Sequence, residues 1–299
     1  MPRLFYCDHH VLPLPAGHKF PAEKYALLRA AIEAEGGYTL EPAPFADPAR
    51  IELAHDPAYV RAILDGTVDP RVMRRIGFPW SEQLARRTLG SVGGTLAATA
   101  DALATGFGGN LAGGTHHALY SEGAGFCVFN DLAVAIRSYG LRAAVIDLDV
   151  HQGDGTAAIF AGDPNVLTVS LHGENNFPFR KQQSSIDVAF PDGTEDAAYL
   201  ERLDETLPAV AAFRPEIVFY QAGVDGLAGD RLGRLALTHE GLMERDRRVF
   251  RFARENSLPL VITLGGGYSN PIERTVAAHA NTFRTALGVL QPFPRKVRL

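Results

Sequence analysis

The sequence predicts an α/β fold, a doubly wound domain with a mostly parallel central sheet. Short apolar runs rich in β-branched residues alternate with amphipathic segments, as expected for buried parallel strands joined by helices. The runs cover residues 143–150, 166–172, 216–223 and 258–267. No repeat, low-complexity linker or shift in composition divides the chain, so we expect residues 1–299 to form one domain.

Three segments outside these runs have helical periodicity. Residues 20–37 begin near a proline and end on two glycines, the usual asymmetry of a helix. Residues 237–256 place an apolar stripe on one face and offer Thr238 as an N-cap. Residues 81–106 carry glycines inside a helical period, which predicts close packing of this helix at Gly90, Gly93 and Gly94.

The composition is that of a soluble globular protein, with 46% hydrophobic and 21% charged residues. A net charge of -5 without long runs of one sign argues against a nucleic-acid partner. No stretch approaches the roughly 20 apolar residues that span a bilayer, and the first residues lack the apolar centre of a signal peptide. We therefore expect a cytoplasmic protein without a membrane partner. Cys7 and Cys127 are too few for a disulfide framework.

Ionisable side chains gather in the loops next to the predicted strands. The segment DLDVHQGDGT, residues 147–156, follows a core strand directly, where buried charge is costly unless it is paired or binds a metal. In an open α/β sheet, ligands bind outside the carboxyl ends of the strands. The loops at these ends supply Asp225, Asp230 and Tyr268, and the segment before the first run contributes the pair His116 and His117.

Asp149 and His151 are candidate metal ligands. Residues i and i+2 of an extended segment project to the same face, so both side chains can converge on one ion. Asp225 ends another predicted strand at the corresponding place and can supply the third ligand. Two carboxylates and one imidazole leave coordination positions open for water and substrate, which is typical of a catalytic metal site.

The neighbouring side chains fit hydrolysis. His116 and His117 can supply a general base, and Asp147 and Asp154 can each hold one imidazole in a single tautomer. The phenol of Tyr268, after three glycines, can donate a hydrogen bond to a developing oxyanion. A metal, a base and an oxyanion donor together indicate hydrolysis of an acyl compound, most simply an amide.

Simpler interpretations compete for each motif. An Asp-x-His segment can be a helix cap, an HH pair can be solvated or part of a core, and an Asp before glycine is an ordinary turn. The coincidence of all these motifs at successive strand ends of one predicted sheet favours a functional site.

Six ordered motifs resemble the zinc-dependent histone deacetylase family. They are GGTHHA, GFCVFND, VIDLDVHQGDGT, TVSLH, AGVDGLAGDRLGRLALT and LGGGY. The opening LPLPAGHKFPAEKY resembles the bacterial, class IV-like branch of this family. The resemblance implies the arginase/deacetylase fold, a single-domain three-layer α/β sandwich with a central mostly parallel sheet.

The resemblance also implies a role for each candidate residue. His117, paired with Asp154, would be the general base, and His116, paired with Asp147, a companion acid or electrostatic group. Tyr268 would polarise the substrate carbonyl. Zinc, or iron(II) in the cell, would be held by Asp149, His151 and Asp225. A structural potassium ion would be held at Asp147, Asp149, His151, Ser170 and Leu171.

An implied narrow channel receives the acyl-lysine chain. Gly125 and Phe126 match family positions along it, and Phe177 is our candidate for the facing wall. At the channel rim, peptide-binding relatives carry an Asp, whereas the matching stretch here is Phe78-Pro79-Trp80. This departure leaves room for small acylated amines beside peptides.

We therefore expect a metal-dependent hydrolase that removes acetyl or other acyl groups from lysine side chains of peptides or proteins. Acetylpolyamine deacetylation is the neighbouring alternative, and it would favour an acidic, constricted entrance. Arginase-like ureohydrolysis ranks low because the additional carboxylates of a two-metal site are absent. A non-catalytic acyl-lysine-binding module or a zinc-stabilised structural protein remain alternatives from other classes, the latter requiring a closed coordination shell.

Overall fold

The computed structural model describes residues 1–290, so the last nine residues of the predicted domain lie outside the described residues. The described chain forms one sheet of eight strands in the order β2-β1-β3-β8-β7-β4-β5-β6, and all neighbouring strands pair in parallel. The strands are β1 (Arg3–Tyr6), β2 (Thr39–Pro42), β3 (Phe107–Asn110), β4 (Ala143–Asp147), β5 (Val166–Gly173), β6 (Ile186–Phe190), β7 (Ile217–Gln221) and β8 (Leu260–Thr263). The predicted α/β class with a parallel sheet is confirmed.

The four strands expected from sequence are β4, β5, β7 and β8, which lie side by side in the sheet. The other four were missed because none of them belongs to a long apolar run of the sequence. Strand β3, for example, reads FGGN. Both end residues of β2 are exposed, so the sequence of β2 does not indicate that this segment pairs with β1. Strand β4 ends at Asp147, three residues before the predicted end, because the chain turns into the loop that carries the ionisable residues.

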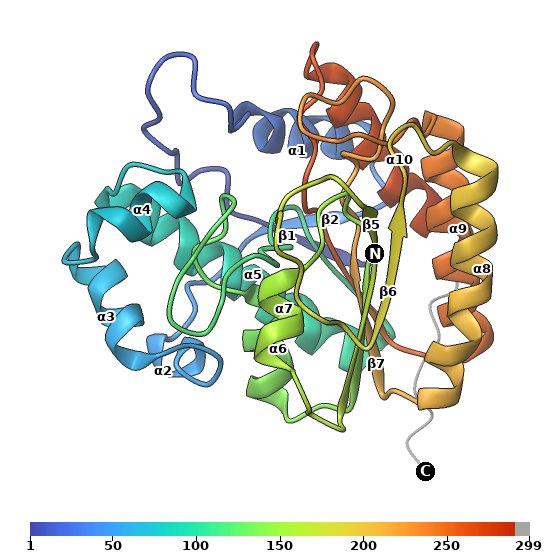
Figure 1. Ribbon diagram of the computed structural model, residues 1–299, viewed down its shortest axis with the longest axis horizontal. Helices are drawn as coiled ribbons and strands as arrows, with labels where there is room; N and C mark the ends of the chain where they lie inside the picture. Colours follow the sequence, from blue (N-terminus) through green and yellow to red (C-terminus); the bar gives the residue numbers. More distant parts are fainter. Residues whose placement is uncertain (291–299) are drawn as a thin grey trace.

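Helices cover both faces of the sheet (Figure 1). Helices α8 (Asp196–Phe213), α9 (His239–Glu255), α10 (Glu273–Leu290) and α1 (Glu23–Glu35) pack in a row along one face. The other face carries α5 (Glu82–Thr105), α6 (Asp131–Tyr139) and α7 (Asp154–Ile159). The short helices α2 (Pro48–Ile51), α3 (Pro57–Asp65) and α4 (Pro70–Ile76) form a lobe beyond α5. This is the predicted three-layer sandwich. No described helix is long and apolar enough to cross a membrane.

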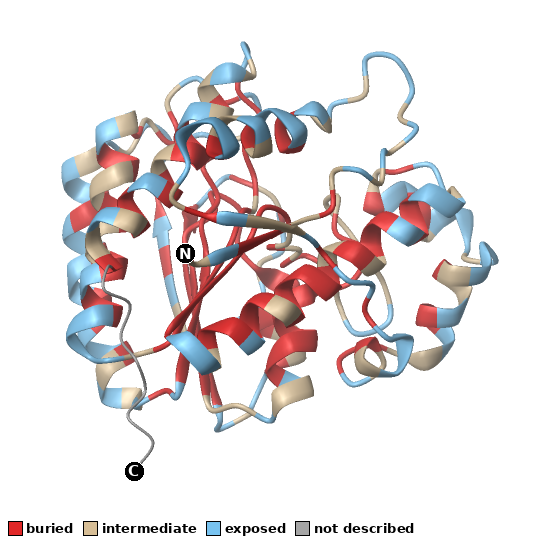
Figure 2. Cartoon of the chain, turned by 180° about the vertical axis from the view of Figure 1, so that it is seen from behind, coloured by how far each residue is buried: buried red, intermediate tan, exposed pale blue. Residues whose placement is uncertain are grey.

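The predicted helices match α1, α5 and α9. Thr238 caps α9, its Oγ1 accepting a hydrogen bond from the backbone N–H of Gly241, and the predicted stripe of α9 is buried. The α5 glycines do permit close packing. A Cβ at Gly93 would overlap the Pro44 backbone, and one at Gly94 would overlap the Asn110 side chain of β3. Helix α5 therefore lies close enough to the sheet to be largely buried (Figure 2).

The sheet brings the predicted site residues to one edge. Asp147 is the last residue of β4, and it pairs in register with Ser170 of β5 on one side and Gln221 of β7 on the other. Gln221 in turn pairs with Thr263, the last residue of β8. The loops that follow β4, β7 and β8 therefore start side by side at the carboxyl edge of the sheet.

Candidate active site

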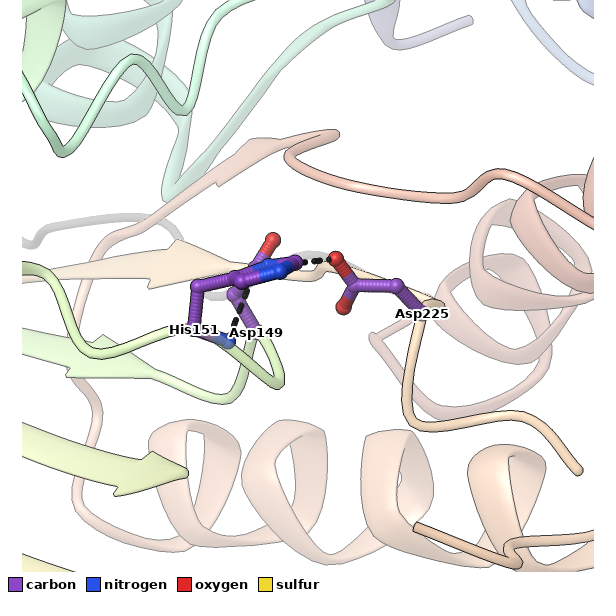
Figure 3. A group of neighbouring side chains, drawn as sticks. All are labelled: Asp149, His151 and Asp225. Atoms are coloured by element: carbon purple, nitrogen blue, oxygen red, sulfur yellow. Dashed lines mark hydrogen bonds and ion pairs between the residues drawn. The ribbon is translucent and has the colours of Figure 1, made fainter. Parts of the chain in front are cut away.

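Asp149, His151 and Asp225 converge at the carboxyl edge of the sheet. His151 Nδ1 lies 2.9 Å from Asp149 Oδ1 and 3.0 Å from Asp225 Oδ2. All three side chains are buried, and each offers one ligand atom within 4.8 Å of the others. Figure 3 shows Asp225 reaching from the loop after β7 toward His151, which comes from the loop after β4. This geometry can hold one metal ion.

The donor chemistry of this triad fits a divalent cation. Asp225 Oδ1 accepts a hydrogen bond from the Val150 N–H, whereas its buried Oδ2 receives none from the described residues. Burial and the nearby Asp149 carboxylate raise the pKa of Asp225 to about 6. Burial alone would lower the pKa of His151, but the Asp225 and Asp149 carboxylates outweigh it and raise the pKa to about 10. The buried carboxylates of the triad therefore need a compensating positive charge, which a metal cation can supply in place of a proton.

Each of the two adjacent histidines contacts its own carboxylate. His116 Nδ1 lies 2.7 Å from Asp147 Oδ2, and His117 Nδ1 lies 2.6 Å from Asp154 Oδ1. Burial opposes protonation of His116, but Asp147 and Asp149 raise its pKa to about 9. Burial and the His116 imidazole lower the pKa of His117 to about 4. Near neutral pH, His117 is therefore the neutral imidazole that can accept a proton.

Tyr268 is held at the same edge by the loop after β8. Its backbone N–H donates to Asp230 Oδ2 at 2.6 Å, and Asp230 Oδ1 accepts from the N–H groups of Leu232 and Gly233. Burial raises the pKa of the Tyr268 phenol well above its ordinary value, so the hydroxyl stays protonated and able to donate. A Cβ at Gly266 would overlap the Asp225 carboxylate, which explains the glycines before the tyrosine.

A cavity of about 220 Å³ opens over these groups. His117, His151 and Tyr268 line it together with the predicted wall residues, Gly125, Phe126 and Phe177. Phe177 lies against His117, with ring centroids 4.9 Å apart, and across from Gly125. The remaining lining residues are Asn175, Asn176, Phe179, Leu232 and Arg234.

The stretch Phe78-Pro79-Trp80 differs from its expected place at the rim. Phe78 is buried, and its ring packs behind Phe126 with centroids 5.4 Å apart. The Trp80 indole N–H donates to the Ile63 carbonyl at 2.8 Å, and its ring covers Gly66. None of the three lines the cavity, because the stretch packs with the neighbouring lobe of α3 and α4. The exposed residues among those that line the cavity are instead Asn175, Phe179 and Arg234, which we call the cavity mouth.

Two buried cations beside the site were missed by sequence reasoning. Lys24 of α1 donates to the Gly265 carbonyl at 3.1 Å and lies over the Tyr268 ring, and burial lowers its pKa to about 8. Arg245 of α9 is fully buried and donates to the carbonyls of Leu148 and Gly223, which lie just before two of the candidate ligands. The only sequence signal was a charge within the buried stripe of each helix.

Two of the candidate potassium residues, Asp149 and His151, belong to the triad, and the other three come from the paired strands β4 and β5. Asp147 and Ser170 are register partners in β4 and β5, and Leu171 follows Ser170. Ser170 Oγ contacts His172 Nδ1 at 3.0 Å.

Comparison with known proteins identifies the family. The profile described as "Histone deacetylase domain" matches residues 18–283. The chain belongs to the histone deacetylase family. Among family relatives, an uncharacterized protein of Picosynechococcus sp. is 43% identical over 295 residues, which cover 95% of this chain and 98% of that protein. Histone deacetylase 2 of Arabidopsis thaliana is 37% identical over 215 residues, 69% of this chain and 54% of the plant protein, so this chain matches about half of that protein's length.

Solved structures share the histone deacetylase fold. The crystal structure of the HDA15 HD domain superposes with a TM-score of 0.79, at 22% identity, covering 96% of this chain and 91% of that domain. The acetylpolyamine aminohydrolase of Burkholderia pseudomallei superposes with a TM-score of 0.76, at 24% identity, covering 95% of this chain and 98% of that enzyme. As a member of the histone deacetylase family, the chain is a hydrolytic enzyme of the deacetylase and amidohydrolase class.

Proposed function

We propose that this enzyme is a zinc-dependent deacylase that hydrolyses the amide between an acyl group and a lysine side chain. One observation carries the proposal. Three buried ligand atoms lie within 4.8 Å of one another, and one of these ligands, His151, lines a cavity together with the neutral His117 and the protonated Tyr268. Acetylated small amines are the second candidate, because the chain also shares its fold with an acetylpolyamine aminohydrolase.

Asp149, His151 and Asp225 would hold the zinc ion. When bound, a divalent cation acts as a Lewis acid toward water and the substrate carbonyl. Iron(II) is the alternative ion, because imidazole and carboxylate ligands suit both metals.

The other residues would act on the substrate directly. His117 takes a proton from the water that attacks the carbonyl carbon, while Asp154 holds its Nδ1–H and aims Nε2 at the cavity. Tyr268 donates a hydrogen bond to the carbonyl oxygen as negative charge develops there. The C–N bond then breaks, the lysine amine leaves with a proton, and a carboxylate remains. His116, paired with Asp147, supplies a nearby positive charge.

The cavity walls would fit the substrate chain. Phe126 and Phe177 present aromatic surface that can pack against the methylenes of a lysine stem. We further propose that potassium binds through Asp147, Asp149, His151, Ser170 and Leu171, a set supported by the pairing of β4 with β5.

Hydrolysis of a panel of acyl-lysine peptides and acetylated polyamines, from acetyl to long-chain acyl groups, tests the proposal. Each substrate is assayed with native protein, after a chelator, and after zinc or iron(II) is added back. We expect release of acid from acyl-lysine that the chelator abolishes and one metal restores. Activity that persists in the metal-free protein would contradict the proposal.

A further inference from the structure

The one charged and exposed side chain among the described residues that line the cavity is an arginine. Arg234 lines the mouth and is exposed, whereas no Asp or Glu is among the described residues that line the cavity. The guanidinium therefore meets a substrate before the acyl group reaches the floor.

Local contacts hold Arg234 in this place. Its backbone carbonyl accepts a hydrogen bond from the Gly193 N–H at 2.7 Å, which fixes the segment against the turn after β6. Its Nη1 donates to Asp192 Oδ2 at 3.1 Å, and the other oxygen of Asp192 accepts from the Asn175 side-chain amide at 3.3 Å. Both oxygens of the nearest carboxylate are thus already engaged, whereas other guanidinium N–H groups of Arg234 remain free to bind substrate.

The remaining charges near the mouth do not reverse this balance. Lys181 donates to the carbonyls of Asn176 and Pro178, so it adds a cation behind the lining. The Asp154 and Glu174 carboxylates both interact with Lys181 and offset its charge. Among these described residues, Asp192 is paired with Arg234, Glu174 interacts with Lys181, and Asp154 interacts with both Lys181 and His117. None of these three carboxylates is left without a cationic or imidazole partner to attract a cationic substrate.

We propose that Arg234 is a specificity-determining residue, which favours acyl-lysines next to acidic residues and disfavours cationic acylpolyamines. This inference rests on the proposed deacylase function. A carboxylate beside the acyl-lysine replaces Asp192 as a partner of the guanidinium, whereas the free ammonium of an acylpolyamine is repelled. Because Arg234 and Asp192 are both exposed, the pair costs little to open.

The test uses three acetyl-lysine peptides that differ only in the residues flanking the lysine, which are Asp, Ala or Arg, together with acetylputrescine. The zinc-loaded full chain should hydrolyse the Asp peptide with a kcat/KM about threefold to tenfold above that of the Arg peptide, and acetylputrescine most slowly. The ratio should shrink as salt rises. It should fall to about one in Arg234→Gln and invert in Arg234→Glu.

Arg202→Gln is the matched control, since Arg202 is also an exposed arginine in a surface ion pair but lies on α8, outside the cavity lining. It should keep the wild-type ratio. An unchanged ratio in Arg234→Glu, or acetylputrescine turnover equal to that of the Asp peptide, would overturn the inference.

Failure of the deacylase function has a different signature, namely no turnover of any substrate, including the neutral Ala peptide. The affinities of the Asp and Arg peptides, measured by calorimetry on the wild type and Arg234→Glu, then decide the inference alone. Equal affinities in both proteins would refute it.

Discussion

At the residue scale, Tyr268 and Asp225 have separate expected effects. Tyr268 lines the cavity without belonging to the triad, so Tyr268→Phe should leave the zinc content unchanged while lowering kcat by about 10²- to 10³-fold, the usual effect of losing one oxyanion donor. Metal analysis of the purified variant beside single-turnover kinetics measures both quantities.

Asp225→Ala should lose zinc and activity together, because the triad then retains only one carboxylate and one imidazole. Metal analysis of the two variants, purified in parallel, provides the comparison. Equal loss of metal from both would show that Tyr268 has been assigned the wrong role.

Sequence reasoning found these residues because each chemistry-bearing side chain stands at a strand end, where the pattern of apolar runs can place it. Lys24 and Arg245 could not be placed in the same way. Both side chains bind backbone carbonyls next to the site, which carry no residue-specific signal, and these contacts exist only after α1 and α9 pack on the sheet. The other partner of Arg245 is Asp246, its neighbour in the chain, which does not indicate where the arginine lies.

At the element scale, α9 supports the candidate metal site through Arg245. Its guanidinium donates to Gly223 at 2.6 Å and to Leu148 at 3.2 Å, joining the segments that lead to Asp225 and Asp149. Arg245→Lys keeps the charge but loses the planar fork, so we expect zinc affinity to fall about tenfold.

Competition with a chromophoric chelator measures the affinity. Arg251→Lys, on the exposed face of the same helix, is the control and should bind zinc like the wild type. Equal affinities in all three proteins would exclude a supporting role for α9.

His55 connects the start of α3 to the start of α6. Its Nδ1 lies 2.9 Å from the Leu119 carbonyl, and its Nε2 accepts a hydrogen bond from the N–H of Asn130, the α6 N-cap. A protonated imidazole could not accept that bond, and burial lowers the pKa of His55 to about 4.

The unfolded chain binds this proton near pH 6.5 and the folded chain only near pH 4, so stability contributed by His55 is present above pH 6.5 and lost as the pH falls. We expect His55 to contribute about 2 kcal/mol to the loss between pH 6.5 and 5. Urea unfolding at both pH values should therefore show a smaller loss in His55→Gln than in the wild type. An equal loss would show that His55 titrates normally.

At the scale of the whole molecule, bound metal should stabilise the fold. The triad joins the loops after β4 and β7, and its buried carboxylates repel each other without a cation. Zinc at about 100 times its Kd should add about 2.7 kcal/mol, which raises the melting temperature by about 4 °C. Thermal unfolding with zinc and with a chelator measures the shift. Asp225→Ala should show none, and a shift in that variant would place the stabilising zinc elsewhere.

The architecture as a whole was predictable because the central strands are long apolar runs, whereas the margins of the sheet were not. Strands β1, β2 and β3 have four residues each, as has β8, but only β8 belongs to one of the long apolar runs of the sequence, 258–267. The other three strands gain their stability from neighbours rather than from their own sequence. The position of Phe78-Pro79-Trp80 in the lobe could not be derived from its place in the chain either. It depends on contacts such as the hydrogen bond from the Trp80 indole to the Ile63 carbonyl, which form only when the chain folds.

The single carboxylate of Asp230 joins the mouth of the cavity to its floor, since it receives the N–H groups of Leu232 and Gly233 as well as that of Tyr268. The loop at the mouth consequently cannot be replaced without affecting Tyr268. A foreign loop grafted at the cavity mouth to accept a new amine would also displace the Tyr268 phenol, unless the graft carries an acid at the position of Asp230. A change of the mouth loop in this enzyme therefore affects both substrate selectivity and turnover.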